Sequence, residues 1–369
     1  MVEFIKGYKV KYKILTPVHI GTGEELSPFD YVIVDNMFHR ISADELISSL
    51  SDEQLRMFYS YIRVNNITSL RSLIVANFKS EKFSKYSVRV LPGVANKYRE
   101  NLNNINNQLL ISPFIRTPDS FKPYIPGSSI KGAIRTAIID DIVRGKKYEK
   151  KYKPQGANWE LFAMEAVEIV SSGEKKQERA SISRDPFRTL KISDVFIDNE
   201  VMLIGEVLNA KVNKAKGRLD TIGIQMIKEV VSGYLNLGKP VEFEGEIRID
   251  EFLPRVKRKD MYYGVSMPID KDFIIKTCNY FYSQELRREM EFYEFAVDMH
   301  DIISKMKTLF NVKQNECLIR VGRFSGVYAV TINEYRNPAN KKWGTTRNLF
   351  DGRYPMGWIK IEFLEEIRD

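Results

Sequence analysis

Near its start the chain alternates apolar side chains with lysines. The run reads Tyr8, Lys9, Val10, Lys11, Tyr12, Lys13 and Ile14. Because successive side chains of a β-strand point to opposite faces, this pattern predicts a half-buried strand with one basic face. Further strand patterns follow at 31–34, 37–41, 191–198, 201–212, 241–249 and 317–321, from Val327, and at 358–363. We therefore expect sheets with one apolar face, which other elements of the chain must bury.

Two long helical patterns lie between these strands. Ser42–Glu45 and Ser51–Gln54 match the capping box S-x-x-E/Q and open a mostly helical region at about 42–110. Residues 272–310 carry apolar side chains at every third or fourth position, which predicts the longest helix. Polar runs at 144–153 and 171–181 are expected to be loops.

The order of these elements favours an α+β fold. Each half contains strands, a long helix and further strands, which suits two ferredoxin-like (RRM-like) β-α-β-β-α-β units. At 369 residues the chain exceeds the usual size of one domain. We therefore expect an N-terminal domain over 1–210, with a helical insertion at about 42–110, and a C-terminal domain over 211–369.

The charge balance permits a polyanionic partner without requiring one. Lys and Arg number 57 against 48 Asp and Glu, which leaves a net charge of +9. Cys278 and Cys317 are too few for a disulfide framework and lie among apolar residues. We expect two buried free thiols in a reducing cytoplasm.

Two classes of site are not expected from the sequence. The three histidines, His19, His39 and His300, show no metal-ligand spacing, so we expect no zinc site and no cofactor. A carboxylate-held Mg²⁺ site is the alternative, although no DxD-type cluster stands out. No apolar run approaches the ~18 residues of a membrane span, and the N-terminal residues lack a continuous apolar region of a signal peptide. The chain is expected to be soluble and cytoplasmic, without membrane contact.

The segment Tyr124–Thr136, YIPGSSIKGAIRT, is the strongest candidate for binding chemistry. Pro126 and Gly127 shape a turn, and Ser128 or Ser129 is expected to cap the helix that follows. Lys131 and Arg135 lie one helical turn apart, next to the free N–H groups of the helix start, which suits a phosphate. The alternative is a capped amphipathic helix with two solvated cations. A Walker P-loop is excluded because GxxxxGK[ST] is not matched.

A second glycine turn, Pro17–Gly23, carries His19 between apolar residues and the glycines Gly21 and Gly23. The histidine could contact RNA or act as a general base in metal-independent RNA cleavage. Alternatively, it donates a hydrogen bond to the backbone and packs against a strand end. We favour a binding or structural role, because no second general acid can be named.

Two further segments combine arginines with an aromatic residue. Arg184 and Arg188 flank Asp185-Pro186-Phe187, which suits phosphate contact and base stacking, although an Arg–Asp pair closing a turn explains it equally well. At the loop Gly322–Gly326, Arg320 and Arg323 are similarly combined with the aromatic residue Phe324.

Taken in order, these segments resemble the RAMP superfamily. The matching segments are PVHIGTGEELSPFDYVI at 17–33, YIPGSSIKGAIRTAI at 124–138, RDPFRTLKISD at 184–194 and RVGRFSG at 320–326. More narrowly, they resemble the family of fifth Csm subunits of type III-A CRISPR effector (Csm) complexes. The resemblance runs from near residue 8 to about residue 360.

The resemblance implies RRM-like RAMP domains and a subunit that caps the 3′ side of the guide RNA (crRNA) in a filament of related subunits. It also implies a part in crRNA 3′-end maturation for antiviral defence, by positioning RNA or recruiting host nucleases. The implied partners are crRNA and the neighbouring RAMP backbone and small helical subunits. The loop Gly322–Gly326 would correspond to the glycine-rich loop of the superfamily.

This chain lacks the fuller glycine-rich loop of the RAMP-type guide-processing endonucleases, so we expect no catalysis of its own. The alternatives are a metal-independent endoribonuclease using His19 and a purely structural capping subunit. The predicted RNA-binding residues are His19, Gly21, Gly23, Gly127, Ser128, Ser129, Lys131, Arg135, Arg184, Arg188, Arg320 and Arg323.

Overall fold

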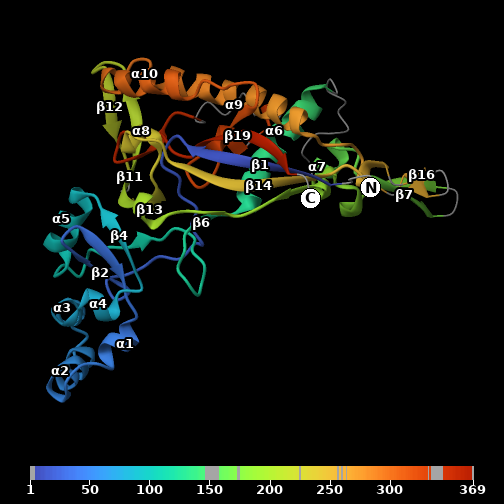
Figure 1. The fold of residues 1–369 in the computed structure, drawn as a ribbon. Coiled ribbons are helices and arrows are strands. Elements are labelled where there is room, and N and C mark those ends of the chain that lie inside the picture. Colours follow the sequence, from blue (N-terminus) through green and yellow to red (C-terminus); the bar gives the residue numbers. More distant parts are fainter. Residues whose placement is uncertain are drawn as a thin grey trace.

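The computed structural model describes residues 5–145, 158–172, 175–223, 226–255, 257–258, 261–262, 264–330, 332–333 and 344–367. Two sheets organise the chain, and helices pack on them (Figure 1). The α+β fold class predicted from the sequence is confirmed.

The first sheet has five strands, with the N-terminal strand at its centre. Its order is β17 (Glu316–Arg320), β19 (Trp358–Ile367), β1 (Ile5–Ile14), β14 (Glu242–Asp250) and β9 (Leu190–Ile192). All neighbours are antiparallel. One strand from the start of the chain therefore pairs on both sides with strands from its second half.

The alternation that predicted β1 has a buried side and a charged side. Val10, Tyr12 and Ile14 are fully buried. On the other face the lysines meet glutamates of the flanking strands. Lys13 Nζ lies 2.8 Å from both Glu316 Oε1 and Glu362 Oε2. The predicted strand is confirmed, and its basic face is largely neutralised by its neighbours.

The second sheet has eight strands. Its path is β2 (Tyr31–Val34), β3 (Met37–Arg40), β4 (Tyr86–Val90), β11 (Met202–Asn213), β13 (Met226–Val231) and β5 (Ile111–Ser112), with β12 (Arg218–Thr221) and β18 (Arg347–Phe350) also paired to β11. The pairs β4–β11 and β13–β5 are parallel. Parallel neighbours require long connections, and along the chain residues 91–201 separate β4 from β11 and residues 113–225 separate β5 from β13.

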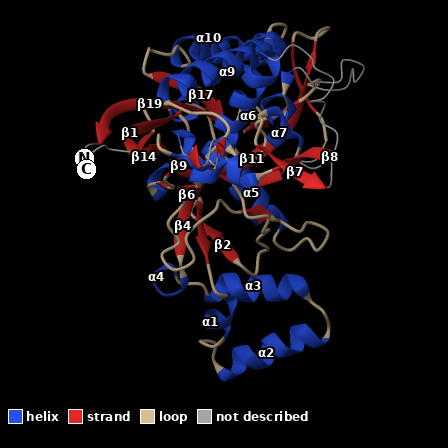
Figure 2. Cartoon of the chain, turned by 90° about the vertical axis from the view of Figure 1, so that its right-hand side faces the viewer, coloured by secondary structure: helices blue, strands red, loops and turns tan. Residues whose placement is uncertain are grey.

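A small helical lobe projects from the body (Figures 1 and 2). It contains α1 (Ala43–Ile47), α2 (Asp52–Arg63), α3 (Ile67–Asn77) and α4 (Ser80–Phe83). The capping box of α2 is complete, since Ser51 and Gln54 each accept the other's backbone N–H. The predicted helical region contains these helices and α5 (Pro92–Asn101), but β4 runs through it and returns the chain to the second sheet.

The body also contains the helices α6 (Gly127–Gly145), α9 (Lys271–Tyr293) and α10 (His300–Leu309), with the short helices α7 (Trp159–Ala163) and α8 (Tyr234–Leu237). Helices α6 and α9 pack on each other and on β17, and Tyr282 Oη donates to Ala133 O at 3.0 Å. Cys278 on α9 and Cys317 on β17 are buried free thiols, as expected. The long helical pattern at 272–310 is confirmed, with a break at 294–299.

Two local predictions are wrong. The polar run at 171–181 contains part of a hairpin of β7 (Val167–Ser172) and β8 (Lys175–Ala180), not a loop. A two-stranded hairpin on its own has no buried face to impose an apolar alternation, so the pattern gave no signal. The strand expected from Val327 is a 3-10 turn, Val327–Val330, which follows Gly326 at φ +88°. Of the loop expected at 144–153, residues 144 and 145 end α6, and the rest lies outside the described residues.

The division into domains 1–210 and 211–369 stays a prediction, and the sheets do not follow it. Residue 210 lies inside β11, and β1 pairs with β14 and β19. Among the described helices, none combines the length and apolar character that a bilayer crossing requires.

Candidate functional site

The structure brings together two glycine segments from opposite ends of the chain. Arg323 N donates to His19 O at 2.9 Å. Gly322 has φ +80°, and a Cβ there would lie 2.4 Å from His19 O. Any side chain at this position would collide with the backbone of the His19 turn. The glycine therefore allows the Gly322–Gly326 loop to pack directly on Pro17–Gly23.

His19 itself is buried, with 2% of its surface exposed. Its Nδ1 donates to Glu229 O at 2.7 Å, which fixes the tautomer with an unprotonated Nε2. Burial, with a smaller contribution from the charges of Lys228 and Arg323, lowers the pKa of His19 to about 4, although the hydrogen bond to Glu229 O opposes this shift. His19 is thus neutral near pH 7 and holds the turn against β13, as the structural alternative expects.

Lys228 on β13 was not predicted as a site residue. It is 4% exposed, and Nζ donates to Ser112 Oγ at 2.5 Å. Burial and the nearby Arg323 lower the pKa of Lys228, and Glu25 opposes them. No carboxylate in the part of the chain that the structure describes forms an ion pair with it. The sequence did carry a signal, since this lysine interrupts an apolar strand, MIKEVV.

Arg323 lies beside this buried ammonium and is exposed. Its guanidinium is 5.7 Å from the Phe324 ring centroid, and within the described ranges it forms no ion pair. The turn containing Gly21 and Gly23 is also exposed. We call Lys228, Ser112, Arg323 and the His19 turn the basic junction. It offers an anion two cationic side chains, one of them largely removed from water.

The second predicted site, at the start of α6, is already occupied by protein groups. The helix begins at Gly127, so Ser128 and Ser129 lie in its first turn and do not cap it. Gly127 N donates to Asp194 Oδ1 at 2.8 Å, and a Cβ at Gly127 would lie 2.1 Å from Ile192 O. The serine cap predicted from the sequence is wrong because a carboxylate from the loop after β9 takes that place.

The two cations of α6 point at protein acceptors. Lys131 Nζ donates to Leu190 O at 2.8 Å. Arg135 forms ion pairs with Glu160 at 2.8 Å and Asp185 at 2.9 Å. RNA contact by these cations stays a prediction, and it would have to use the donors that these partners leave free.

The segment around Asp185 is a pair of 3-10 turns, Ile182–Arg184 and Pro186–Thr189. Asp185 accepts from Phe187 N at 2.9 Å and pairs with Arg135, so the Arg–Asp pair that closes this turn comes from α6. Arg188 is exposed and donates to Ser183 O, and Arg184 is half-buried. Arg188 thus lies at the surface, whereas Nε of Arg184 is buried without a hydrogen-bond partner among the described residues.

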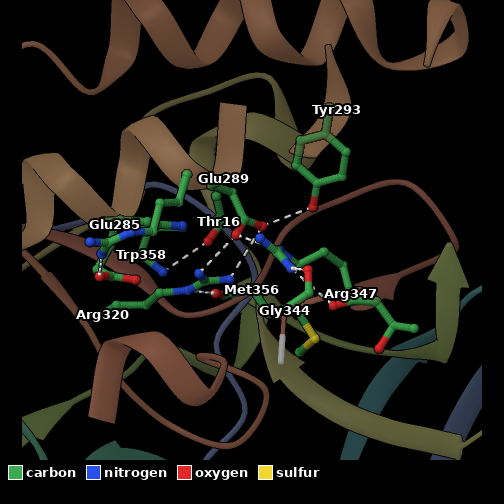
Figure 3. Close-up of polar contacts among 11 residues, drawn as sticks. Thr16, Glu285, Glu289, Tyr293, Arg320, Gly344, Arg347, Met356 and Trp358 are labelled. Carbon is green, nitrogen blue, oxygen red and sulfur yellow. Dashed lines mark hydrogen bonds and ion pairs between the residues drawn. The ribbon is translucent and has the colours of Figure 1, made fainter. Parts of the chain in front are cut away.

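Arg320, by contrast, belongs to a buried ion network (Figure 3). It is 5% exposed, and its guanidinium donates to Glu289 Oε2 at 3.1 Å and to Met356 O at 2.9 Å. Glu289 also accepts from Arg347 Nε and Tyr293 Oη, both at 2.8 Å. Burial alone would raise the pKa of Glu289, but the two arginines lower it to about 2. The geometry assigns Arg320 to the core, and its predicted contact with RNA gains no support.

The model of the RAMP superfamily matches residues 11–348. Two relatives are named CRISPR system Cms protein Csm5. The one from Methanocaldococcus jannaschii is 30% identical over 196 residues, which cover 50% of this chain and 42% of that protein. The one from Streptococcus thermophilus is 24% identical over 221 residues, which cover 57% and 58%. The chain spans about half the length of the curated relatives it matches.

Two solved structures share the fold. One is a chain of a cryo-EM structure of a Csm–crRNA–target RNA ternary complex in a type III-A CRISPR-Cas system, with a TM-score of 0.65 and 20% identity, covering 97% of this chain and 100% of that one. The other is the crystal structure of T. onnurineus Csm5, with a TM-score of 0.62 and 18% identity, covering 95% and 99%. At these identities the likeness shows the fold alone.

The buried His19 predicts a pH dependence of stability. Its folded-state pKa of about 4 lies below the ordinary value of 6.5, so the unfolded chain takes up a proton first as the pH falls. The contribution is complete above pH 6.5 and is lost towards pH 4, at a cost of about 3 kcal/mol in the free energy of unfolding. Urea denaturation at several pH values measures it. His19→Asn, whose amide can still donate to Glu229, should be less pH-dependent; an equal slope would contradict this account.

The buried network around Glu289 predicts that replacing this glutamate with an uncharged residue lowers the stability of the fold strongly. Glu289→Gln leaves Arg320 and Arg347 without their shared carboxylate and should lower the free energy of unfolding by about 3 to 5 kcal/mol. Glu291→Gln, at an exposed position on the same helix, is the control and should change it by less than about 0.5 kcal/mol. If both variants lose a similar free energy of unfolding, the Glu289 network stabilises the fold no more than an exposed glutamate does.

Proposed function

The chain belongs to the RAMP superfamily, and from this premise we propose that it is the fifth Csm subunit of a type III-A CRISPR effector complex. In this function it binds guide RNA (crRNA), caps the 3′ side of the filament and supports crRNA 3′-end maturation in antiviral defence. The two relatives named Csm5 and the fold shared with a chain of a Csm–crRNA–target RNA complex support the proposal.

The basic junction is the observation that carries RNA binding. A lysine that is almost fully buried, with a hydroxyl as its hydrogen-bond partner, is costly unless a negative charge approaches it. An RNA phosphate seated between Lys228 and Arg323 would supply that charge and raise the pKa of Lys228. Phosphate contacts of this kind hold RNA in place with little reading of its sequence.

We further propose that the chain does not cut RNA itself. A general base works best with a pKa near the working pH, whereas His19 has a pKa of about 4 and a buried ring. Purified protein incubated with precursor crRNA in EDTA should leave it intact. Cuts that disappear in His19→Asn would establish the endoribonuclease alternative instead.

In the proposed complex the partners are crRNA, the neighbouring RAMP backbone subunits and small helical subunits, in the cytoplasm. Host nucleases would trim the crRNA 3′ end. Crosslinking within the assembled complex separates this proposal from a purely structural capping role, since only an RNA-binding subunit gives RNA adducts at the basic junction.

Charge removal at the basic junction tests RNA binding directly. Lys228→Met combined with Arg323→Ala should weaken binding of unrelated single-stranded RNAs about tenfold, because two charge-assisted contacts are lost. The slope of log K against log salt concentration should fall by about 1.4. Fluorescence anisotropy over a salt series measures both.

The matched control removes the same charge elsewhere. Lys9→Met combined with Arg248→Ala takes two exposed cations from the first sheet, where each faces glutamates. This pair should leave affinity and salt slope nearly unchanged. If both pairs weaken binding equally, net charge alone accounts for the effect, and the basic junction is not the site.

A further inference from the structure

An aromatic pair lies on the outer face of a short ribbon next to α6. The ribbon pairs β6 (Tyr124–Ile125) with β10 (Val195–Phe196), and Phe196 stands directly opposite Tyr124. Val195 and Ile125 are buried, whereas Phe196 is 49% exposed. The two rings lie 6.1 Å apart between centroids, at 50°. The core thus uses one face of the ribbon and leaves two rings on the other.

A lysine covers the more exposed ring. Lys122 Nζ lies 5.1 Å from the Phe196 ring centroid, and the side chain is exposed. The loop before it is held by Phe121 N donating to Thr117 O at 3.1 Å and by Lys122 N donating to Thr117 Oγ1 at 3.0 Å. Lys122 has no ion pair with any residue in the described ranges. We call Lys122, Tyr124 and Phe196 the ribbon patch.

One segment of chain connects the ribbon patch to the basic junction. Ser112, at its start, accepts the hydrogen bond from Lys228. Ile115 N donates to Ile20 O at 2.8 Å, directly after His19, and Tyr124 N donates to Ile115 O at 3.4 Å. The backbone therefore runs from the basic junction along the His19 turn to the ribbon. The two sites are thus linked along the chain, with Tyr124 twelve residues after Ser112.

We propose that the ribbon patch binds one unpaired nucleobase, stacked on the Phe196 ring against Tyr124, while Lys122 moves to the adjacent phosphate. This inference rests on the proposed function and deepens it by adding a base contact to the phosphate contacts. Stacking suits any base, since each has a π-face, and it therefore adds affinity without sequence preference. The cation–π contact in the free chain keeps Lys122 close to where the phosphate arrives.

The size and charge of the patch favour a base over a protein surface. Asp119, Asp198 and Glu200 are exposed acids that lie within four residues of Lys122 or Phe196 in the sequence. A stable protein interface requires a larger contiguous area with several anchors. The same acids disfavour a long phosphate track, so the patch suits one base and its nearest phosphate.

The test compares two single-stranded oligonucleotides that carry the same backbone. One is oligo(A) RNA, and the other has an abasic ribose at every position, which keeps the phosphates and removes the bases. Phe196→Ala in the full chain should weaken binding of oligo(A) about 5- to 100-fold and leave binding of the abasic strand unchanged. Anisotropy titrations at one salt concentration measure both.

Phe295 provides a matched control. It is 48% exposed and carries Lys214 Nζ 4.4 Å above its ring, but it has no aromatic neighbour among the described residues. Phe295→Ala should leave both affinities unchanged. Phe196→Trp should retain oligo(A) binding, and Phe196→Leu, which keeps apolar bulk without a flat ring, should lose it. Circular dichroism and thermal unfolding verify that each variant is folded.

The outcomes separate this inference from the proposed function. If Phe196→Ala binds oligo(A) like the wild type, or weakens both strands equally, the ribbon patch does not stack a base. If Phe196→Ala leaves RNA affinity intact but prevents assembly with neighbouring subunits, the patch is a protein contact and the inference is wrong. If Phe196→Ala weakens only oligo(A) while Lys228→Met with Arg323→Ala has no effect, the ribbon patch stands and the basic junction fails.

Discussion

The pairing of β1 between β14 and β19 is the constraint on which the rest of the structure depends. It joins the start of the chain to its last strand, and the contacts continue past the end of β1. Trp358 N donates to Thr16 Oγ1 at 2.9 Å, and Gly357 N donates to Pro17 O at 2.8 Å. Val321 N then donates to Gly357 O. The Gly322 loop thereby meets the His19 turn, so the candidate site is a consequence of strand pairing.

A net charge of +9 says little about where an anion binds, because most of the notable cations are used internally. Lys13 faces glutamates across the sheet, Arg135 holds two carboxylates, and Arg320 shares Glu289 with Arg347. Lys228, Arg323 and Lys122 differ from them, since no described carboxylate pairs with any of the three. We propose that these three, among the cations without a described carboxylate partner, hold RNA.

The sequence predicted those elements that depend on residues close together along the chain. The alternation of β1, the capping box at Ser51 and the helical run at 272–310 all follow from neighbouring residues. The partners of Lys131 and Arg135 could not be predicted, because Leu190, Glu160 and Asp185 reach α6 only through tertiary packing. Phe196 lies in an apolar run, Val195–Ile197, so its exposure was equally hidden. The sequence shows Lys228 among the apolar residues of MIKEVV, but only the structure shows that its side chain is buried.

The glycines of the recognisable motifs have a structural reason that differs from the binding role first assigned to them. Gly322 is required because it approaches His19 O, and Gly127 because it approaches Ile192 O. At both positions a side chain would collide with the backbone of another segment. The glycines position neighbouring side chains without having to touch RNA themselves. Of the residues proposed to hold RNA, Arg323 and Tyr124 lie within the motifs, whereas Lys122, Lys228 on β13 and Phe196 on the β6–β10 ribbon lie outside them.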